Sequence, residues 1–342
     1  MTNGLLSYLF TRLRAVPLLF CRACVRVGWL RLHLLCACSD CVSAPARSVS
    51  GERRVNEWAA VLRARSALLA ARLLLTHSAM LLDAAACAES ERLAQRLLAL
   101  HRQPPLVLAN AWDGASARAV ASTEGIEALA TASFAIAAAH GLSDAELDLE
   151  TNLAVARVIG AVAHQHSLPF TVDLQHGYGD RLEEAIERAI EAGAHGCNLE
   201  DLLADESDLL SSAEACSRIQ RARSAAIGAG VPSFVLNARC DALNLGQPLD
   251  VAVQRIGSYL AAGASVTFVW RKGPGLTADE TTRLVAAVPA GRFCSQAQPG
   301  GLSVREMAAM GVGRISVGPG LLHESNALIV RRTAELLAGG AM

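Results

Sequence analysis

Pro169-Phe-Thr-Val-Asp-Leu-Gln-His-Gly-Tyr-Gly-Asp180 and, shortly after it, Gly196-Cys-Asn-Leu-Glu-Asp201 are the two stretches that decide the fold. Each is a short apolar run that ends abruptly in polar and acidic residues, and a helical pattern lies between them. In a parallel α/β protein this arrangement places Asp173, Glu200 and Asp201 at the carboxyl ends of neighbouring strands. Because α/β barrels build their active sites at that end, the same stretches predict where the function lies.

The segment between these runs has the pattern of an amphipathic helix. Asp180 is the expected N-cap, with Glu183 at the capping-box position. Gly193 stands where a helix commonly ends in a left-handed residue. Glu184 and Arg188 are four residues apart, so we expect them to pair on the solvent face. The pattern therefore predicts one strand–helix–strand unit.

Apolar runs of strand type recur from about residue 89 to the C-terminus, separated by helical patterns. They lie at Leu106–Leu108, Ala128–Ala132, Phe170–Leu174, Gly196–Leu199, Phe234–Leu236, Val266–Trp270, Arg292–Ser295 and Ile315–Val317. Nearly continuous apolar runs are typical of parallel strands that helices cover on both faces. Eight such units over roughly 250 residues predict a (β/α)8 TIM-type barrel. An open doubly wound sheet is the alternative, but no G-x-G-x-x-G follows the first strand.

Residues 1–88 differ in composition from residues 89–342, which we expect to form the barrel. The first acidic residue is Asp40, and arginines interrupt the apolar runs before it, so no membrane helix of about 20 apolar residues is available. We expect a disordered or irregularly helical leader, or a segment added by an over-extended gene model. An Arg-rich organelle-targeting peptide and a small accessory module are the alternatives. Cys21-x-x-Cys24 with Cys36-x-Cys-x-x-Cys41 could bind zinc, although the one-residue spacing suits such a site poorly.

The composition narrows the classes of partner. The formal net charge is −1, with neither a basic excess nor an acidic tail, so no nucleic-acid partner is expected. Half of the ten cysteines lie before residue 42 and the others are scattered, which is unlike the disulfide framework of a secreted protein. We therefore expect a reducing compartment, the cytoplasm, and no association with a membrane.

Polar residues at the expected strand ends suit a metal ion and an acidic substrate. Asp173 and Gln175 share a face by the two-residue period of a strand, and Glu200 ends the next strand. Two carboxylates and an amide oxygen are ligands for a hard octahedral cation such as Mg²⁺, which usually retains several waters. Arg239 can offer a bidentate fork to a substrate carboxylate or phosphate. The alternative is a structural network in which Arg239 pairs with Glu200 or Asp241, and Asp173 pairs with another arginine.

Three further positions have candidate roles, and for two of them two interpretations stay open. Asp113 can be catalytic or can cap the helix that follows it. His176 is a candidate acid or base at the mouth of the site. Gly318-Pro-Gly320 can bind phosphate through backbone N–H groups or be a plain strand-to-helix turn.

Several motifs that occur in order resemble those of the isocitrate lyase/phosphoenolpyruvate mutase superfamily. They are Asn110-Ala-Trp-Asp-Gly-Ala-Ser-Ala-Arg118, Ala130-Thr-Ala-Ser-Phe-Ala-Ile-Ala138 with Gly141-x-x-Asp144, Val172-Asp-Leu-Gln-His-Gly-Tyr-Gly179, Gly196-x-Asn-Leu-Glu-Asp201 and Asn237-Ala-Arg239. The resemblance covers about residue 90 to the C-terminus. It implies a (β/α)8 barrel and a homo-oligomer, such as a dimer or tetramer, in which the last helix is often exchanged between subunits.

The resemblance also implies the chemistry and the residues that carry it. Members use Mg²⁺, with Mn²⁺ possible, to make or break C–C or P–C bonds in small 2-oxo, 2-hydroxy or phosphono carboxylic acids. The implied residues are Asp173, Glu200 and Gln175 for the metal, Asp144 and Arg239 for catalysis, and the backbone N–H groups of Ser133 and Phe134, with Arg239, for the substrate carboxylate.

The sequence departs from the superfamily pattern at three places. Gln175 stands where an acid is usual, which removes one negative charge from the metal site. Leu202-Leu-Ala-Asp-Glu-Ser-Asp-Leu209 replaces the gating loop and contains no Cys, Lys or His, so isocitrate lyase activity itself is not expected. Val269-Trp270 occupies the place of an expected histidine. The leading hypothesis is a Mg²⁺-dependent lyase or hydrolase for such acids. The alternatives are a catalytically silent barrel that binds a small acid or a protein, and a phosphate-binding barrel of another superfamily.

Overall fold

The computed structural model describes residues 84–102, 105–203 and 207–341. The expected leader over residues 1–88 therefore lies outside the described residues, except for residues 84–88, which belong to a helix described over residues 84–100. The interpretations of residues 1–83 as a targeting peptide, zinc module or disordered segment fall on that undescribed part. Across the described ranges, no helix is both long enough and apolar enough to span a bilayer.

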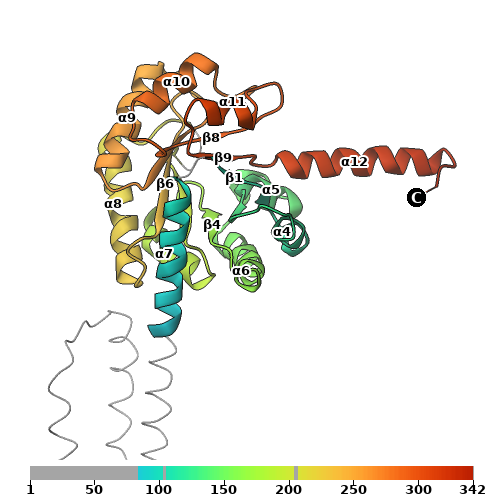
Figure 1. Cartoon of the computed structure of the whole chain (residues 1–342), viewed down its shortest axis with the longest axis horizontal. Coiled ribbons are helices and arrows are strands. Elements are labelled where there is room, and N and C mark those ends of the chain that lie inside the picture. Colours follow the sequence, from blue (N-terminus) through green and yellow to red (C-terminus); the bar gives the residue numbers. More distant parts are fainter. Residues whose placement is uncertain (1–83, 103–104, 204–206, 342) are drawn as a thin grey trace, which may run out of the picture. The chain divides into compact units, whose positions relative to one another are not determined.

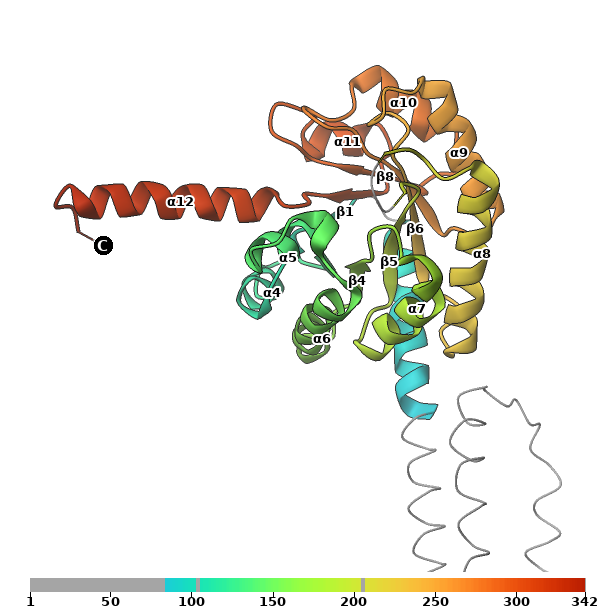
Figure 2. The same cartoon turned by 180° about the vertical axis from the view of Figure 1, so that it is seen from behind.

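The strands form one parallel sheet that closes into a barrel, as Figures 1 and 2 show. Two short strands, β1 (Leu106–Leu108) and β2 (Asn110–Ala111), are pieces of one strand, because β1 pairs with the last strand and β2 with the third. The other strands are β3 (Leu129–Thr131), β4 (Phe170–Asp173), β5 (Gly196–Glu200), β6 (Val235–Cys240), β7 (Val266–Val269), β8 (Phe293–Gln296) and β9 (Arg314–Ser316). The predicted (β/α)8 TIM-type barrel is confirmed.

Helices connect the strands and cover the outside of the barrel (Figure 2). They are α4 (Gly114–Ala121), α5 (Ser133–Ala139), α6 (Leu149–Gln165), α7 (Leu182–Glu191), α8 (Ser212–Gly228), α9 (Leu249–Ala261), α10 (Ala278–Ala286), α11 (Val304–Ala309) and α12 (Gly320–Leu337), with short 3₁₀ turns η2 (Asp144–Glu146) and η3 (Gly179–Arg181). Every residue of β4 and of β7 is buried, as expected for strands with helices outside and side chains filling the barrel inside.

The entry into α7 differs from the sequence prediction. Tyr178 has a φ of +58°, and the 3₁₀ turn η3 follows it, so α7 begins only at Leu182, with Arg181 as its N-cap. The prediction of Asp180 as N-cap is therefore wrong, and Glu183 pairs with Arg221 of α8 at 2.6 Å instead. A turn inserted between the loop and the helix moves the cap, which local sequence cannot reveal.

The end of α7 agrees with the prediction. Gly193 adopts a φ of +91° just after the helix, the left-handed conformation that glycine enters without a steric penalty. Glu184 and Arg188 pair at 3.0 Å on the exposed face. These features depend on residues three to five apart, so the sequence alone could predict them.

The helix over residues 84–100 packs against the amino-terminal end of the barrel. Leu97 is fully buried and lies in one cluster with interior side chains such as Val235 and Val266. Glu91 accepts hydrogen bonds from the backbone N and the hydroxyl of Ser233, at 2.9 and 2.6 Å. The position expected to start the barrel, residue 89, therefore lies inside a helix that belongs to the barrel core.

The last helix, α12, extends away from the barrel (Figures 1 and 2). Leu322 is its buried residue, whereas Leu328, Ile329 and Val330 are 46%, 61% and 70% exposed. Exposed apolar surface of this kind is a common mark of an interaction site.

Candidate active site

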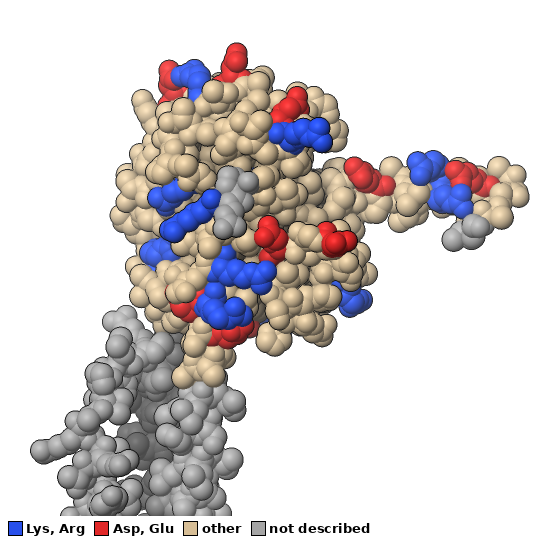
Figure 3. Space-filling view, in the orientation of Figure 1, with Lys and Arg blue, Asp and Glu red and all other residues tan. Residues whose placement is uncertain are grey.

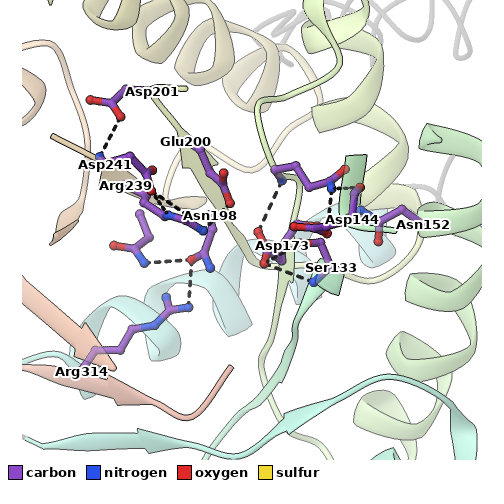
Figure 4. Close-up of polar contacts among 12 residues, drawn as sticks. Ser133, Asp144, Asn152, Asp173, Asn198, Glu200, Asp201, Arg239, Asp241 and Arg314 are labelled. Atoms are coloured by element: carbon purple, nitrogen blue, oxygen red, sulfur yellow. Dashed lines mark hydrogen bonds and ion pairs between the residues drawn. The ribbon is translucent and has the colours of Figure 1, made fainter. Parts of the chain in front are cut away.

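The candidate site is built at the carboxyl ends of β3 to β6 and is drawn in Figure 4. Asp173 ends β4, and its backbone N donates to Thr131 Oγ1 of β3 at 2.8 Å. The backbone N and the hydroxyl of Ser133, at the start of α5, each donate to Asp173 Oδ2 at 3.2 Å. Because α5 starts directly after β3, the chain brings its first N–H groups to this carboxylate. Asp173 is thus fixed before any ligand arrives.

Gln175 connects the loop after β4 to the loop after β3. Its Nε2 donates to the carbonyl oxygen of Asp144 at 2.7 Å and to Asp144 Oδ1 at 2.9 Å. The residue is 6% exposed and has a φ of +50°, a conformation that a non-glycine residue adopts only where its surroundings hold it there. Its buried Oε1 has no hydrogen-bond partner. A buried acceptor without a donor is costly, so this oxygen is suited to accept a hydrogen bond or to bind a cation.

Asp144 has an altered acidity. Burial, followed by the charge of Asp173, raises the pKa of its carboxyl to about 6, although hydrogen bonds from Ser133 and Gln175 and the charge of Arg239 oppose the rise. A carboxyl that titrates close to neutral pH is suited to proton transfer. Two carboxylates pushed together at the end of a barrel are a common sign of a functional site.

Arg239 is held by two acids and an aromatic ring. Its Nη1 lies 2.5 Å from Glu200 Oε1, and its Nη2 lies 2.7 Å from Asp241 Oδ1. The guanidinium carbon lies 4.5 Å from the ring centroid of Trp270, close enough for a cation–π interaction. Burial raises the pKa of Glu200, whereas the charge of Arg239 opposes that rise. Both salt bridges considered from the sequence are therefore present.

The charges at this end of the barrel do not balance. Arg239 forms ion pairs with Glu200 and Asp241, and it also interacts electrostatically with Asp144 and Asp173. Among the described residues, no three His, Cys, Asp or Glu side chains converge closely enough to form a metal cage. Mg²⁺ does not require one, because it is usually bound through one or two carboxylates and keeps several waters. Asp173 and the unpartnered Gln175 Oε1 have the donor chemistry that such a cation needs.

The structure brings together most of the residues predicted to form the site. Figure 4 shows Asp144, Asp173 and Ser133 on one side, and Glu200 and Arg239 on the other. Only the backbone of Phe134 was expected there, and its side chain is 46% exposed and packs edge-on against His323 of α12, with ring centroids 5.9 Å apart.

Asp201 does not face the site, contrary to the expectation from its place at the end of a strand. It accepts hydrogen bonds from Tyr259 Oη at 2.5 Å and from Arg255 Nε at 2.9 Å, both on α9, and is 2% exposed. Successive residues of a strand point to opposite faces, so when Glu200 points inward Asp201 must point outward. Its role is to fasten α9 to the barrel.

Two other open alternatives are resolved by hydrogen bonds. Asp113 Oδ1 accepts from Ser116 N at 2.7 Å, so Asp113 caps α4. Asn110 Oδ1 accepts from the backbone N of Val317 and of Gly318, at 3.1 and 2.9 Å. These two N–H groups are already satisfied, which argues against a phosphate site in that turn.

Sequence reasoning missed two polar residues that support the site. Asn152, in the middle of α6, donates through Nδ2 to the carbonyl oxygen of Asp173 and to Tyr178 Oη, both at 2.8 Å. Thr131 Oγ1 accepts a hydrogen bond from the backbone N of Asp173. A fully buried asparagine on the apolar face of a helix was the available signal, because buried amides need partners.

Comparisons with known proteins agree with this geometry. Residues 97–337 match the phosphoenolpyruvate phosphomutase family. A phosphonomutase-like protein of Burkholderia cenocepacia J2315, known from its crystal structure, is 35% identical and superposes with a TM-score of 0.65 over 73% of this chain and 100% of its own. An uncharacterised protein of Mycobacterium tuberculosis is 30% identical over 64% of this chain and 79% of its own. An oxaloacetate decarboxylase of Rhodopseudomonas palustris is 33% identical over 37% of this chain and 45% of its own.

The barrel, the acid cluster at its carboxyl end and the family match lead to one classification. The chain belongs to the phosphoenolpyruvate phosphomutase family, within the isocitrate lyase superfamily. It is an enzyme of the lyase and mutase type.

Proposed function

We propose that this protein is a Mg²⁺-dependent lyase or hydrolase that makes or breaks a C–C or P–C bond in a small 2-oxo, 2-hydroxy or phosphono carboxylic acid. The observation that supports the proposal most strongly is the buried Gln175 Oε1, which lacks a partner beside Asp173 in a site with more carboxylates than guanidinium groups. A divalent cation would satisfy that oxygen and balance the charge. Mn²⁺, which favours similar oxygen ligands, could replace Mg²⁺.

The residues present suit separate tasks in such a reaction. Asp173 and Gln175 would hold the cation directly, and Glu200 would assist through water. When bound, the cation would stabilise negative charge on the substrate oxygens. The first N–H groups of α5, at Ser133 and Phe134, would receive the substrate carboxylate at a helix N-terminus. In the structure Ser133 N donates to Asp173, so the substrate carboxylate would share this N–H with Asp173.

Arg239 and Asp144 are the residues that we propose to act on the reacting part of the substrate. Arg239 uses one donor of Nη1 on Glu200 and donors of Nε and Nη2 on Asp241, which leaves a second N–H on each Nη nitrogen for a substrate anion. Asp144, with its pKa raised to about 6, would exchange a proton with the substrate near neutral pH. The name of the matched family refers to P–C chemistry and that of the R. palustris relative to C–C chemistry, so the proposal covers both.

A homo-oligomer, such as a dimer or tetramer, is part of the proposal. The exposed apolar surface of α12 supports it, since Ile329 and Val330 would be covered by a neighbouring subunit. In Figure 3 α12 carries both acidic and basic side chains, with uncharged surface between them. The contact between Phe134 and His323 would then link the base of the exchanged helix to α5.

A catalytically silent barrel that binds a small acid is the second candidate. Two observations favour it: Gln175 replaces an acid, and the segment over residues 202–209 has no Cys, Lys or His to act as an acid or base. It predicts that a small acid binds without any requirement for a metal.

Calorimetric titration of Mg²⁺ into the purified protein, with and without oxalate, separates the two candidates. Oxalate resembles a planar enolate carboxylate, so the proposed enzyme should bind it only when Mg²⁺ is present. Asp173→Ala is the control and should bind neither. Oxalate binding that is equal with and without Mg²⁺ would favour the silent barrel, and binding of neither ligand to the unaltered protein would contradict the proposal.

A further inference from the structure

A buried guanidinium lies inside the barrel, beneath the acid cluster. Arg314 is the first residue of β9, paired in register with Leu106 of β1 and Cys294 of β8, and is 3% exposed. Its side chain points along the interior toward Asn198 of β5, as Figure 4 shows. Arg314 Nη2 donates to Asn198 Oδ1 at 3.2 Å. A long cationic side chain therefore reaches from the lower part of the barrel toward the level of the site.

This charge has no ion-pair partner in the described part of the chain. No carboxylate there lies within 4.0 Å of the Arg314 guanidinium, and Arg314 Nη1 has no hydrogen-bond partner. Burial, followed by the charge of Arg314, lowers the pKa of His101 to about 3, so this ring stays neutral and adds no second positive charge beside Arg314. A buried charge without a partner is strongly destabilising in itself. The presence of Arg314 therefore indicates a functional role rather than a stabilising one.

The register of the sheet places the charge next to the proposed metal site. Asp173 of β4 pairs with Asn198, and Asn198 pairs with Asn237 of β6, so these three residues form one level of the barrel. Asn237 Nδ2 donates to the same Asn198 Oδ1 at 2.8 Å. Asp173 is the carboxylate whose charge raises the pKa of Arg314, against the larger lowering by burial. The acid on this level of the barrel is thus the one proposed to hold the cation.

We propose that Arg314 is a positioning residue that sets the balance between cation and anion binding at the site above it. The proposal rests on the proposed metal-dependent function. A fixed positive charge beneath Asp173 repels a divalent cation and attracts the carboxylate of a substrate. It would keep Mg²⁺ weakly held and exchangeable in a cluster that otherwise contains more acids than bases, and it would favour the binding of the substrate anion.

A purely structural role predicts something different. If Arg314 only held Asn198 in place, its replacement would disturb the level that includes Asp173 and would weaken Mg²⁺ and oxalate together. The charge role predicts effects of opposite sign on the two ligands. A unit charge in a partly buried site can change the binding of another ion by about tenfold or more.

The experiment compares the full-length protein with Arg314→Met, Arg314→Gln and Arg314→Lys at constant ionic strength. Calorimetry measures the Kd of Mg²⁺ alone and then the Kd of oxalate at saturating Mg²⁺. Arg314→Met should bind Mg²⁺ about tenfold more tightly and oxalate about tenfold more weakly, and Arg314→Lys should restore both values. Arg314→Gln keeps a donor for Asn198 without the charge, so it should behave like Arg314→Met and serves if the methionine variant does not fold.

Arg292→Met is the matched control, because Arg292 donates to the carbonyl oxygens of Ser265 and Ala264 away from the site. It should leave both Kd values unchanged. Parallel weakening of both ligands, or no change, in the neutral Arg314 variants would overturn the inference while leaving the proposed function standing. If the unaltered protein binds no Mg²⁺, the proposed function fails. The inference is then supported by Mg²⁺ binding to the neutral variants and overturned by its absence.

Discussion

At the scale of single residues, Asp173 is the position on which the others depend. Its Oδ2 accepts two hydrogen bonds from Ser133, and its Oδ1 lies 3.4 Å from the backbone N of Gln175. These hydrogen-bond donors orient the carboxylate, and none of them carries a formal positive charge. A cation would therefore meet a preformed ligand.

Replacing Asp173 should abolish Mg²⁺ binding. Asp173→Ala removes the proposed main ligand and leaves the Ser133 donors without an acceptor, so we expect a loss of at least about a hundredfold in Mg²⁺ affinity by calorimetry. Asp201→Asn, on the outward face of the same end of the barrel, is the control and should change stability rather than metal affinity. Unaltered Mg²⁺ binding by Asp173→Ala would remove this residue from the metal site.

Gln175→Glu should tighten Mg²⁺ binding by about tenfold, because it adds a carboxylate next to Asp173. It should also raise the pKa of Asp144 further, since the amide donor to Asp144 Oδ1 is replaced by a like charge. Gln175→Met, of similar size and without an oxygen, serves as the control and should weaken Mg²⁺ binding. Weaker binding by Gln175→Glu would mean that the amide is required for its geometry, including its tie to the loop of Asp144.

In the absence of metal, Asp144 should make the free energy of unfolding decrease as the pH rises. Its folded pKa of about 6 is above the ordinary value of 3.8, so the folded state binds the proton more tightly than the unfolded state. The contribution of Asp144 is therefore fully present below about pH 4 and is lost as the pH rises to about 6. Urea unfolding of the unaltered protein and of Asp144→Asn should diverge by about 1–3 kcal/mol over that window. A difference that does not vary with pH would contradict the raised pKa.

At the scale of elements, loops and helix starts decide where the functional groups lie. The start of α5 aims its N–H groups at Asp173, and η2 presents Asp144 to Gln175. The helix α12 differs from the other helices because almost none of its surface is buried in the described part of the chain. Each of these features depends on how an element meets a neighbour.

The exposed apolar side of α12 should be an interface between subunits. Ile329→Glu places a charge where we propose that a neighbouring subunit packs, and burial of an unpaired carboxylate is strongly unfavourable. The variant should therefore shift the protein toward the monomer in analytical ultracentrifugation, with an unchanged circular dichroism spectrum. Arg305→Glu on α11 is the control and should leave the mass unchanged. An unaltered oligomer, or a natural protein that is already monomeric, would contradict the prediction.

At the scale of the whole molecule, the barrel core includes a segment that precedes its first strand. Leu93, Ala94 and Leu97, on the helix over residues 84–100, are at most 3% exposed. Their side chains cover the amino-terminal end of the barrel opposite the proposed site. The stability of the site should therefore depend on residues that never approach it.

A chain that begins at Ala84 should fold and bind Mg²⁺ like the full-length protein, whereas a chain that begins at Pro105 should not. Loss of the helix uncovers interior side chains such as Val235, and losing several buried leucines and alanines costs several kcal/mol. Thermal unfolding followed by circular dichroism compares the two. Equal melting temperatures would show that the helix is dispensable, and failure of the longer chain to fold would mean that residues 1–83 contribute to the core.

The sequence by itself determined the strands, the barrel and the end of the barrel at which the candidate site residues lie. Strand identity depends on short apolar runs, and the carboxyl ends of parallel strands meet at one edge, so the sequence alone groups Asp173, Glu200 and Arg239. The end of α7 at Gly193 and the pair Glu184–Arg188 were predictable because they depend on neighbours a few residues away.

Only the tertiary structure decided the contacts between residues distant in sequence. In the folded chain Asp201 points outward and binds Tyr259, and Arg239 forms salt bridges with two acids. Gln175 Oε1 has no hydrogen-bond partner, and the unpaired charge of Arg314 lies beneath Asp173. Pattern and propensity describe each element alone, whereas hydrogen bonds and charge balance depend on which elements meet and at what register. The fold therefore follows from local periodicity, but the chemistry of the site follows from its packing.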